Sequence, residues 1–377
     1  MRSFLLPFCL VMLLCGYAIS AVSQSTAKAE QADSDNPLLS AIDSLVESTV
    51  RPYIQQSHTA GLSVAVIRKD AVYRYNYGEV RKGNGMLPDP ASTIYEIGSI
   101  SKTFTALLLA REVIDGRMRL DDPVSGYLPD SIPDLHYEGN AVTLQHLSNH
   151  TSGLPRLPDD FFSGMINFAD PYLHYDDARL YGFLMYYKPS VIPGTHYAYS
   201  NYGGGLLGNL LARRANRTYE ELIVDIICRP LGMNHTRITL TKADSAGIAQ
   251  GYNEKGLPAS PWHFPSMPGT GAIRSTLNDM ISYALAQMGR HAGSLEAAIL
   301  LTQQTTFQQG DLALGLGWHI GGTEDSRYWH HTGGTGGFRS FLAFDKNRDM
   351  GVVILSNSTE DVSGMGVRLL KDAFRYF

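Results

Sequence analysis

The stretch "EIGSISKTFTA" (residues 96–106) places a serine, Ser99, three residues before a lysine, Lys102. An apolar run follows at once, with the length and spacing of a buried helix. Residues three apart on a helix share a face, so the hydroxyl and the amine can meet. The helix N-terminus adds free N–H groups and a partial positive charge, which favour an oxyanion and disfavour a second cation. A lysine desolvated at that point can lose its proton and act as a base.

The same spacing occurs at Ser25 and Lys28, in a polar segment rich in Ala, Ser, Gln and Asp. No apolar helix follows there, so nothing would desolvate the lysine or position a substrate. Only the Ser99 match therefore predicts chemistry.

Composition limits the classes of function. Hydrophobic residues make up 44% of the 377 residues and charged residues 18%, which is enough apolar surface for a sizeable core. The net charge of −5 and the lack of a basic stripe with interleaved aromatics argue against a nucleic-acid partner. The charge also disfavours tight binding to an anionic membrane surface.

Residues 1–23 are predicted to be a signal peptide. Arg2 supplies the positive start, an apolar run follows, and the small side chains of Ala21 and Ser23 fit cleavage after Ser23. The run is too short for a spanning helix, so we expect a mature chain without a membrane span, in the periplasm or secreted. An uncleaved anchor and a lipoprotein attached at Cys15 are the alternatives.

Residues 24–36 are interpreted as a flexible leader and residues 37–377 as one folded domain. Cleavage would leave Cys228 as the one cysteine of the mature chain, without an internal disulfide. Its apolar neighbours predict a buried structural cysteine and not a nucleophile.

Strand-forming runs lie at both ends of the domain, at residues 61–68, 71–80, 314–320, 327–334, 339–346 and 350–358. A helix is predicted after the capping pair Asn36-Pro37, and another closes the chain from residue 364. From residue 101 to about 300 the apolar residues recur at helical spacing. The expected fold is α/β (α+β): one antiparallel sheet of N- and C-terminal strands, flanked by helices, with an inserted helical lobe.

Two further segments carry polar groups suited to the chemistry of Ser99. Tyr199-Ser-Asn201 stands just before an apolar helix, and His331-Thr332-Gly333 ends a strand-like run in glycines. A glycine-rich strand edge lets a substrate backbone approach closely and exposes N–H groups.

These three segments, in this order, resemble the motif set of the serine β-lactamase and penicillin-binding-protein superfamily. The Tyr-x-Asn form is similar to class C β-lactamases, certain D,D-peptidases and related esterases. Further family-like strings are "LSNHTSGLP" (147–155), "RPLGMNHT" (229–236) and "GAIRSTLNDM" (271–280). The resemblance implies a β-lactamase/transpeptidase-like fold over the whole domain.

The resemblance also implies a role for each motif residue. Ser99 would form an acyl-enzyme, Lys102 would share its proton transfers, and Tyr199 would act as general base, phenolate-like or poised by cationic neighbours. The backbone N–H groups of Ser99 and Gly334 would form the oxyanion hole. The substrate-binding set would be Asn201, His331, Thr332, Gly333 and Gly334, with no metal and no organic cofactor.

The chain departs from the family pattern at two positions. His331 replaces the third-motif lysine, and a histidine of pKa ~6.5 is mostly neutral at pH 7, so carboxylate recognition should be weaker. Arg156 follows Pro155 where class C enzymes tend to carry a glutamine. Either Arg156 or Arg339 could supply the missing anion anchor.

The expected function is that of a D,D-peptidase or carboxypeptidase on D-amino-acid, peptidoglycan-like peptides, with possible weak β-lactam hydrolysis. The alternatives are an esterase on short acyl esters and a non-hydrolytic penicillin-binding relative. The partner in each case is a small peptide, β-lactam or ester.

Other motifs predict no additional chemistry. His146 and His150 have the spacing of paired zinc ligands, but a third ligand is not evident, so hydrogen bonds that stabilise a loop are expected. The sequence has no Gly-x-Ser-x-Gly elbow, and "GGTGG" (333–337) lacks the lysine of a P-loop.

Overall fold

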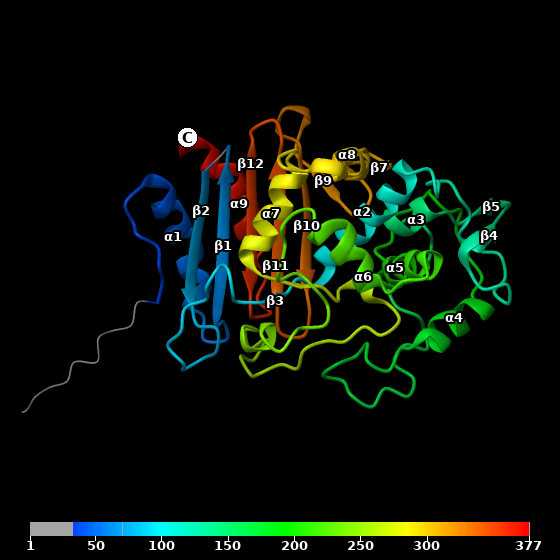
Figure 1. The fold of residues 1–377 in the computed structure, drawn as a ribbon, viewed down its shortest axis with the longest axis horizontal. Coiled ribbons are helices and arrows are strands. Elements are labelled where there is room, and N and C mark those ends of the chain that lie inside the picture. The colour runs from blue at the N-terminus through cyan, green and yellow to red at the C-terminus, as the bar shows by residue number, and fades with distance from the viewer. Residues whose placement is uncertain (1–32, 70, 377) are drawn as a thin grey trace, which may run out of the picture. The chain divides into compact units, whose positions relative to one another are not determined.

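The computed structural model describes residues 33–69 and 71–376, and its centre is an eight-stranded antiparallel sheet (Figure 1). The predicted signal peptide and most of the predicted leader lie outside the described residues. The strand order is β2-β1-β12-β11-β10-β9-β8-β7. The strands are β1 (Gly61–Arg68), β2 (Ala71–Gly78), β7 (Phe307–Gln309), β8 (Leu312–Leu314), β9 (His319–Gly321), β10 (Tyr328–Gly334), β11 (Arg339–Asp345) and β12 (Met350–Ser356).

The N- and C-terminal parts of the chain meet within this sheet, one strand in from its β2 edge. Strand β1 pairs with β12 over seven residues, from Leu62 opposite Ser356 to Arg68 opposite Met350. Both strands are buried along their length, because helices cover both faces of the sheet. The predicted fold, with N- and C-terminal strands in one antiparallel sheet, is confirmed.

Alternate residues of the central strands face two separate cores, as the two-residue period of a strand requires. Val64 and Val66 of β1 pack with α1 (Ala41–Ile54) and α9 (Ser363–Asp372). Ala65 and Ile67 belong to the larger core on the opposite face. Its helices include α2 (Ser101–Ile114), α7 (Leu277–Gln287) and α8 (Glu296–Gln303).

The remaining helices lie beyond α2, as the predicted helical lobe does (Figure 1). They are α3 (Leu144–Ser148), α4 (Asp177–Tyr186), α5 (Asn201–Ala215) and α6 (Tyr219–Ile223), with a π-helical turn at Val224–Cys228. Helix α2 is the hub, since its first ten residues, Ser101–Ala110, are all buried. Its N-terminus therefore lies at the junction of the sheet and the lobe.

Two-stranded pairs complete the described elements. Strand β3 (Tyr95–Glu96) pairs with β6 (Arg274–Ser275), and β4 (His136–Tyr137) pairs with β5 (Asn140–Ala141). The first pair leads directly into the turn that carries Ser99. It fixes that turn to a segment almost 180 residues further along the chain.

The first helix begins later than predicted. It starts at Ala41, with Ser40 as the N-cap, and not after Asn36-Pro37. The side-chain nitrogen of Asn36 instead donates to the hydroxyl of Tyr77, 2.7 Å away, and the carbonyl of Asp33 accepts the N–H of Gly78. These contacts lay the last residues of the predicted leader along edge strand β2 and satisfy its free polar groups.

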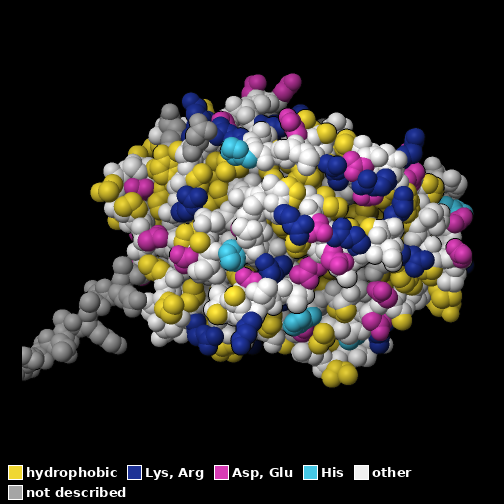
Figure 2. All heavy atoms as spheres, viewed as in Figure 1, with side chains coloured by type: hydrophobic (Ala, Val, Ile, Leu, Met, Phe, Trp, Pro, Cys, Tyr) yellow, Lys and Arg dark blue, Asp and Glu magenta, His cyan; other side chains and the backbone are white. Residues whose placement is uncertain are grey.

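The surface and the thiol of Cys228 agree with ordinary globular packing. Figure 2 shows acidic, basic and apolar side chains mixed over the face that it presents. Cys228 is buried and unpaired, as predicted, and burial raises the pKa of its thiol. None of the helices in the described part of the chain is long and apolar enough to cross a membrane.

Candidate active site

Ser99 lies in a single 3-10 turn, Gly98–Ile100, that runs straight into α2. Gly98 adopts a φ of +50°, which a glycine tolerates without the strain that a β-carbon brings. The side chain of Ser99 is partly exposed, while its neighbours in the turn are buried. The turn thus presents one hydroxyl to solvent at the start of a buried helix, as the sequence predicts.

Lys102 is buried, and its amine has three polar neighbours. Nζ lies 3.0 Å from Ser99 Oγ, 3.0 Å from Asn201 Oδ1 and 2.8 Å from the carbonyl oxygen of Thr270. Burial, and to a smaller extent the charge of Arg156, hold the pKa of this amine well below its usual range.

The partners of Lys102 suit an uncharged amine. Two of them, the amide oxygen of Asn201 and the carbonyl of Thr270, can only accept, and a neutral amine has two N–H groups to give. The lone pair then faces the hydroxyl of Ser99, which can donate to it. Lys102 is therefore placed to take the proton of the nucleophile.

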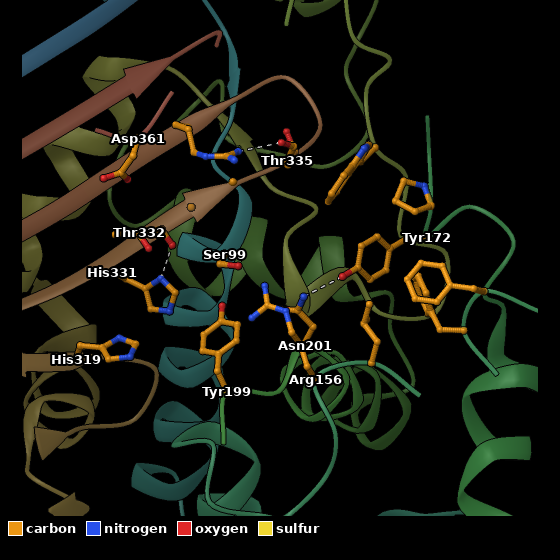
Figure 3. Close-up of a pocket in the computed structure, with 18 residues that line it drawn as sticks. Ser99, Arg156, Tyr172, Tyr199, Asn201, His319, His331, Thr332, Thr335 and Asp361 are labelled. Atoms are coloured by element: carbon orange, nitrogen blue, oxygen red, sulfur yellow. Dashed lines mark hydrogen bonds between the residues drawn. The ribbon is translucent and has the colours of Figure 1, made fainter. Parts of the chain in front are cut away.

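Tyr199 approaches Ser99 from the other side. Its hydroxyl points at Ser99 in Figure 3. Burial raises the pKa of the phenol, and the neighbouring hydroxyl of Ser99 and the charge of Arg156 offset only part of this rise. The resting site therefore holds the phenol, not the phenolate.

Asn201 is the first residue of α5, directly after the capping residue Ser200. Its amide oxygen accepts from Lys102, and its amide nitrogen donates to the hydroxyl of Tyr172 at 2.9 Å. Gly204, one turn on, leaves room for the stem of Lys102, because a β-carbon there would lie 3.1 Å from Lys102 Cε. The orientation of the amide is thus fixed from both ends.

His331 stands on β10 beside Tyr199, with ring centroids 6.4 Å apart. The side chain is only 2% exposed, and Nδ1 lies 2.7 Å from the carbonyl oxygen of Thr332. A carbonyl can only accept, so Nδ1 carries the proton and Nε2 is a bare acceptor, without a partner among the described residues. Burial, with the neighbouring His319 and Lys102, holds the pKa well below its usual range, so this imidazole is neutral.

The glycines at the end of β10 make room for the nucleophile turn. A β-carbon on Gly333 would lie 2.0 Å from the carbonyl oxygen of Ile97, and one on Gly98 would lie 2.5 Å from the amide nitrogen of Gly334. The motif thus brings the Gly334 amide beside Ser99, whereas Thr332 remains exposed. The sequence predicts that these glycines let a substrate backbone approach. In the structure they also make room for the turn that carries Ser99.

Ser99, Tyr199, Asn201 and His331 line one cavity of about 670 Å³, and Lys102 lies buried behind Ser99 (Figure 3). One wall is the end of β10 with Arg339 and Asp361, and the opposite wall is largely aromatic. The aromatic wall consists of Phe161, Phe162, Tyr172 and Trp262.

A buried ion pair holds the aromatic wall in place. Glu96 accepts from the backbone N–H of Trp262, and Arg274 donates to the carbonyl of the same residue, at 3.1 and 3.0 Å. Arg274 also donates to Glu96 at 3.1 Å, and both side chains are less than a tenth exposed. Glu96 precedes Ser99 by three residues, so one pair couples the nucleophile turn to the far wall.

Motif analysis missed three contributors to the site: Tyr172, Thr270 and His150. Tyr172 lies in a loop and Thr270 ends the 3-10 turn Pro268–Thr270, and neither has a recognisable pattern. His150 lies within "LSNHTSGLP", and its ring packs 4.4 Å from that of Tyr199 while Nδ1 accepts the N–H of Ser200.

The zinc-like spacing of His146 and His150 has a structural explanation. Nδ1 of His146 accepts the N–H of Thr143, and His150 accepts from Ser200, so both histidines stabilise loops as expected. The described residues contain no group of three or more side chains that could hold a metal ion.

Comparisons with known proteins agree with this site. The family model described as "Beta-lactamase" matches residues 46–373. The chain is 31% identical over 353 residues to the β-lactamase of Pseudomonas fluorescens, covering 84% of this chain and 93% of that protein. It is 28% identical over 383 residues to the β-lactamase of Escherichia coli K12, covering 91% and 93%.

Solved structures with a similar fold are also β-lactamases or their relatives. A class C β-lactamase in complex with cefoxitin superposes with a TM-score of 0.76 at 26% identity, covering 88% of this chain and 98% of that one. A β-lactamase/D-alanine carboxypeptidase from Pseudomonas syringae gives 0.77 at 26% identity, covering 89% and 99%. With the family model spanning most of its length, this chain belongs to the β-lactamase family and is a serine hydrolase with the class C fold.

Proposed function

We propose that this serine hydrolase cleaves D-amino-acid peptides of the peptidoglycan type as a D,D-carboxypeptidase, and that it turns over β-lactams slowly. The observation that carries the proposal is the free edge of β10 beside Ser99. Strand β9 pairs with β10 only at residues 328–330, so residues 331–334 have no strand partner on that side among the described residues. An extended peptide can add there as a further strand, between β10 and Asn201.

The first half of the reaction is acylation. Lys102, as a neutral amine, takes the proton of Ser99 while Oγ attacks the peptide carbonyl. The N–H groups of Ser99 and Gly334 receive the oxyanion. The phenol of Tyr199 then gives its proton to the leaving amine, and Lys102 restores that proton as the carbonyl re-forms.

The second half is hydrolysis of the ester. Water replaces the leaving amine in the pocket, and its proton passes to the same two groups as it attacks the acyl carbon. Ser99 departs with a proton, and the free acid leaves. Because both steps use the same groups, a variant that loses Tyr199 or Lys102 should slow acylation and hydrolysis together.

Arg339 is the proposed anchor for the terminal carboxylate. Its Nη1 donates to the carbonyls of Thr335 and Phe338, and Nη2 has no hydrogen-bond partner among the described residues. The side chain is half-buried and lines the cavity on the β10 side. Neutral His331 contributes no charge there, so Arg339 is the cation on the β10 side of the cavity, whereas Arg156 lies on the lobe side beside Tyr199.

The test is a substrate panel. Turnover of a D-Ala-D-Ala peptide is compared with that of the same peptide ending in a carboxamide, a chromogenic cephalosporin and a p-nitrophenyl ester. The proposal requires the free-acid peptide to be preferred, and requires that preference to disappear in Arg339→Gln. Equal turnover of acid and amide by the wild type would contradict it. Labelling by fluorescent penicillin, mapped by mass spectrometry and absent in Ser99→Ala, locates the acyl-enzyme.

Hydrolysis of short acyl esters is the second candidate, and the uncharged His331 favours it, because an ester needs no cation at that position. Faster turnover of the ester than of either peptide would support it. Stable penicillin labelling without turnover of any substrate would instead indicate a non-hydrolytic binder. Export to the periplasm or medium is proposed from the predicted signal peptide, and fractionation of a tagged full-length chain tests it.

A further inference from the structure

Arg156 is a cation in contact with the site and has no ion-pair partner among the described residues. Its guanidinium carbon lies 5.1 Å from the ring centroid of Tyr199, and the ammonium nitrogen of Lys102 lies 5.0 Å from the same centroid. Figure 3 shows the guanidinium next to the Tyr199 ring, below Ser99. The side chain belongs to the loop after α3 and reaches the cavity from the lobe.

The backbone of Arg156 is firmly placed. Its carbonyl accepts the N–H groups of Asn201 and Tyr202 at 3.0 and 3.2 Å, so the loop is fastened to the first turn of α5. Helix α5 thus holds the loop in the position that places the guanidinium beside Tyr199. Neither contact depends on a bound substrate.

The other groups around Tyr199 bring no fixed positive charge. The titratable or charged side chains that surround it, on every element packed against it, are Lys102, His150, Arg156, Tyr172, Tyr197, His319 and His331. Burial holds His150 and His331 neutral, and it lowers the pKa of His319 too. Lys102 is itself the proton acceptor, and burial lowers the pKa of its amine, which favours the neutral form. Arg156 alone of this set is charged at every relevant pH.

We propose that Arg156 is a positioning residue of the reaction: its fixed charge, held against the ring of Tyr199, keeps Lys102 able to take the proton of Ser99 and helps Tyr199 to give up its own. A cation at position 331 on β10 would exert this electrostatic effect from one side of the Tyr199 ring. Arg156 exerts it from the other side. The proposal concerns activation of Ser99 and holds for any acyl donor, so it does not depend on whether peptide or ester is the natural substrate.

The electrostatics give the direction of the effect. A neighbouring cation lowers the pKa of both an amine and a phenol, because it disfavours the added proton. Arg156 acts in this direction on both Lys102 and Tyr199. Removing it should leave more of Lys102 protonated near neutral pH, and raising the pH should restore the neutral amine that accepts the proton of Ser99.

The experiment measures how fast an uncharged fluorophosphonate probe modifies Ser99, by intact mass spectrometry between pH 5 and 9. The probe carries no carboxylate, so a role of Arg156 in holding a substrate anion cannot affect the rate. Arg156→Gln is expected to react about tenfold more slowly at pH 7, with the deficit shrinking toward pH 9. Arg156→Lys keeps the charge and should stay within about twofold of the wild type at each pH.

Further variants test whether the positive charge near Tyr199, and not the arginine side chain as such, sets the rate. Adding His331→Lys to Arg156→Gln returns a cation to the other side of Tyr199 and should recover part of the lost rate at pH 7. Arg229→Gln is the matched control, because Arg229 is exposed and pairs with Asp225 outside the cavity. An Arg156→Gln deficit of the same size at every pH, or no deficit, overturns the proposal. Labelling that persists in Ser99→Ala would instead remove Ser99 as the nucleophile.

Discussion

Gly98 and Gly334 meet backbone to backbone, so closely that a β-carbon on Gly98 would lie 2.5 Å from the amide nitrogen of Gly334. The first residue precedes Ser99, and the second carries the N–H group proposed for the oxyanion hole. This close approach depends on the absence of a side chain at Gly98.

Replacing Gly98 with alanine tests this relationship. The positive φ would cost about 1–2 kcal/mol, and the clash would separate the two N–H donors, so kcat should fall about 10²-fold or more. The control is Gly116→Ala, where φ is +71° but nothing lies within 4 Å of an added β-carbon. The control should lose stability and keep its activity. Equal kcat values for the two variants would show that the close approach is not required.

Tyr199→Phe is expected to lower kcat about 10²- to 10⁴-fold, because the leaving amine loses its proton donor. The matched control is Tyr197→Phe, two residues away, whose hydroxyl bonds to Nε2 of His319 at 3.0 Å and not to Ser99. Kinetics on an activated ester, whose leaving group needs no proton, should show a smaller loss in Tyr199→Phe. A loss of equal size for ester and peptide would contradict the assignment of Tyr199 as proton donor.

Arg274→Met removes one partner of a buried ion pair and leaves Glu96 without its charge partner. We expect the free energy of unfolding to fall by about 3 kcal/mol, measured by urea denaturation. Arg119→Met, which breaks the exposed pair with Asp121, should change it by less than about 1 kcal/mol. Tryptophan fluorescence should also shift in Arg274→Met, since Trp262 loses the donor to its carbonyl. Unchanged stability would mean that the pair does not hold this wall.

Stability at acid pH should depend on His330. Burial, with a smaller contribution from His319, lowers the pKa of His330 to about 4 in the folded chain, against roughly 6.5 when unfolded. The unfolded chain therefore binds a proton that the folded chain does not, and stability falls as the pH drops from about 6.5 to 4. One such group contributes at most about 1.4 kcal/mol per pH unit.

The variant His330→Asn lacks this proton, so its stability should fall less steeply over the same range. Urea midpoints at half-unit intervals of pH, wild type against variant, measure the difference in slope. Parallel curves would show that His330 takes up its proton in the folded chain. The remaining buried histidines, among them His150 and His331, keep some acid sensitivity in both proteins.

The sequence predicts the reacting groups better than their surroundings. Ser99, Lys102, Tyr199 and Asn201 come together because each occupies a position next to the start of a helix, where short-range spacing and a known motif carry the information. The long strands β1, β2, β10, β11 and β12 were equally predictable, since they are alternating or continuous apolar runs. The run 314–320, predicted as one strand, instead spans the end of β8 and most of β9, and β7 was not predicted. The start of α1 was predicted wrongly, because the side chain of Asn36 bonds to Tyr77 on edge strand β2 and Ser40 is the N-cap instead.

Long-range partners account for what was missed. Thr270 reaches Lys102 across 168 residues, and Tyr172 reaches Asn201 from an irregular loop. Neither has a local pattern, because loop conformation is fixed by tertiary contacts. The tautomer and neutrality of His331 likewise depend on a carbonyl and on burial that only the folded chain provides.

The pairing of β1 with β12 has a consequence for biosynthesis. A ribosome must have released residue 356 before β1 can pair with β12, so until then β1 is paired only with β2. Pairing over such a sequence separation is slow, and a β1–β2 hairpin with one open edge is prone to aggregate in the meantime. A nascent chain of this design remains without its catalytic centre until β10 to β12 have been made, and a chaperone that shields the first hairpin should raise the yield of active protein.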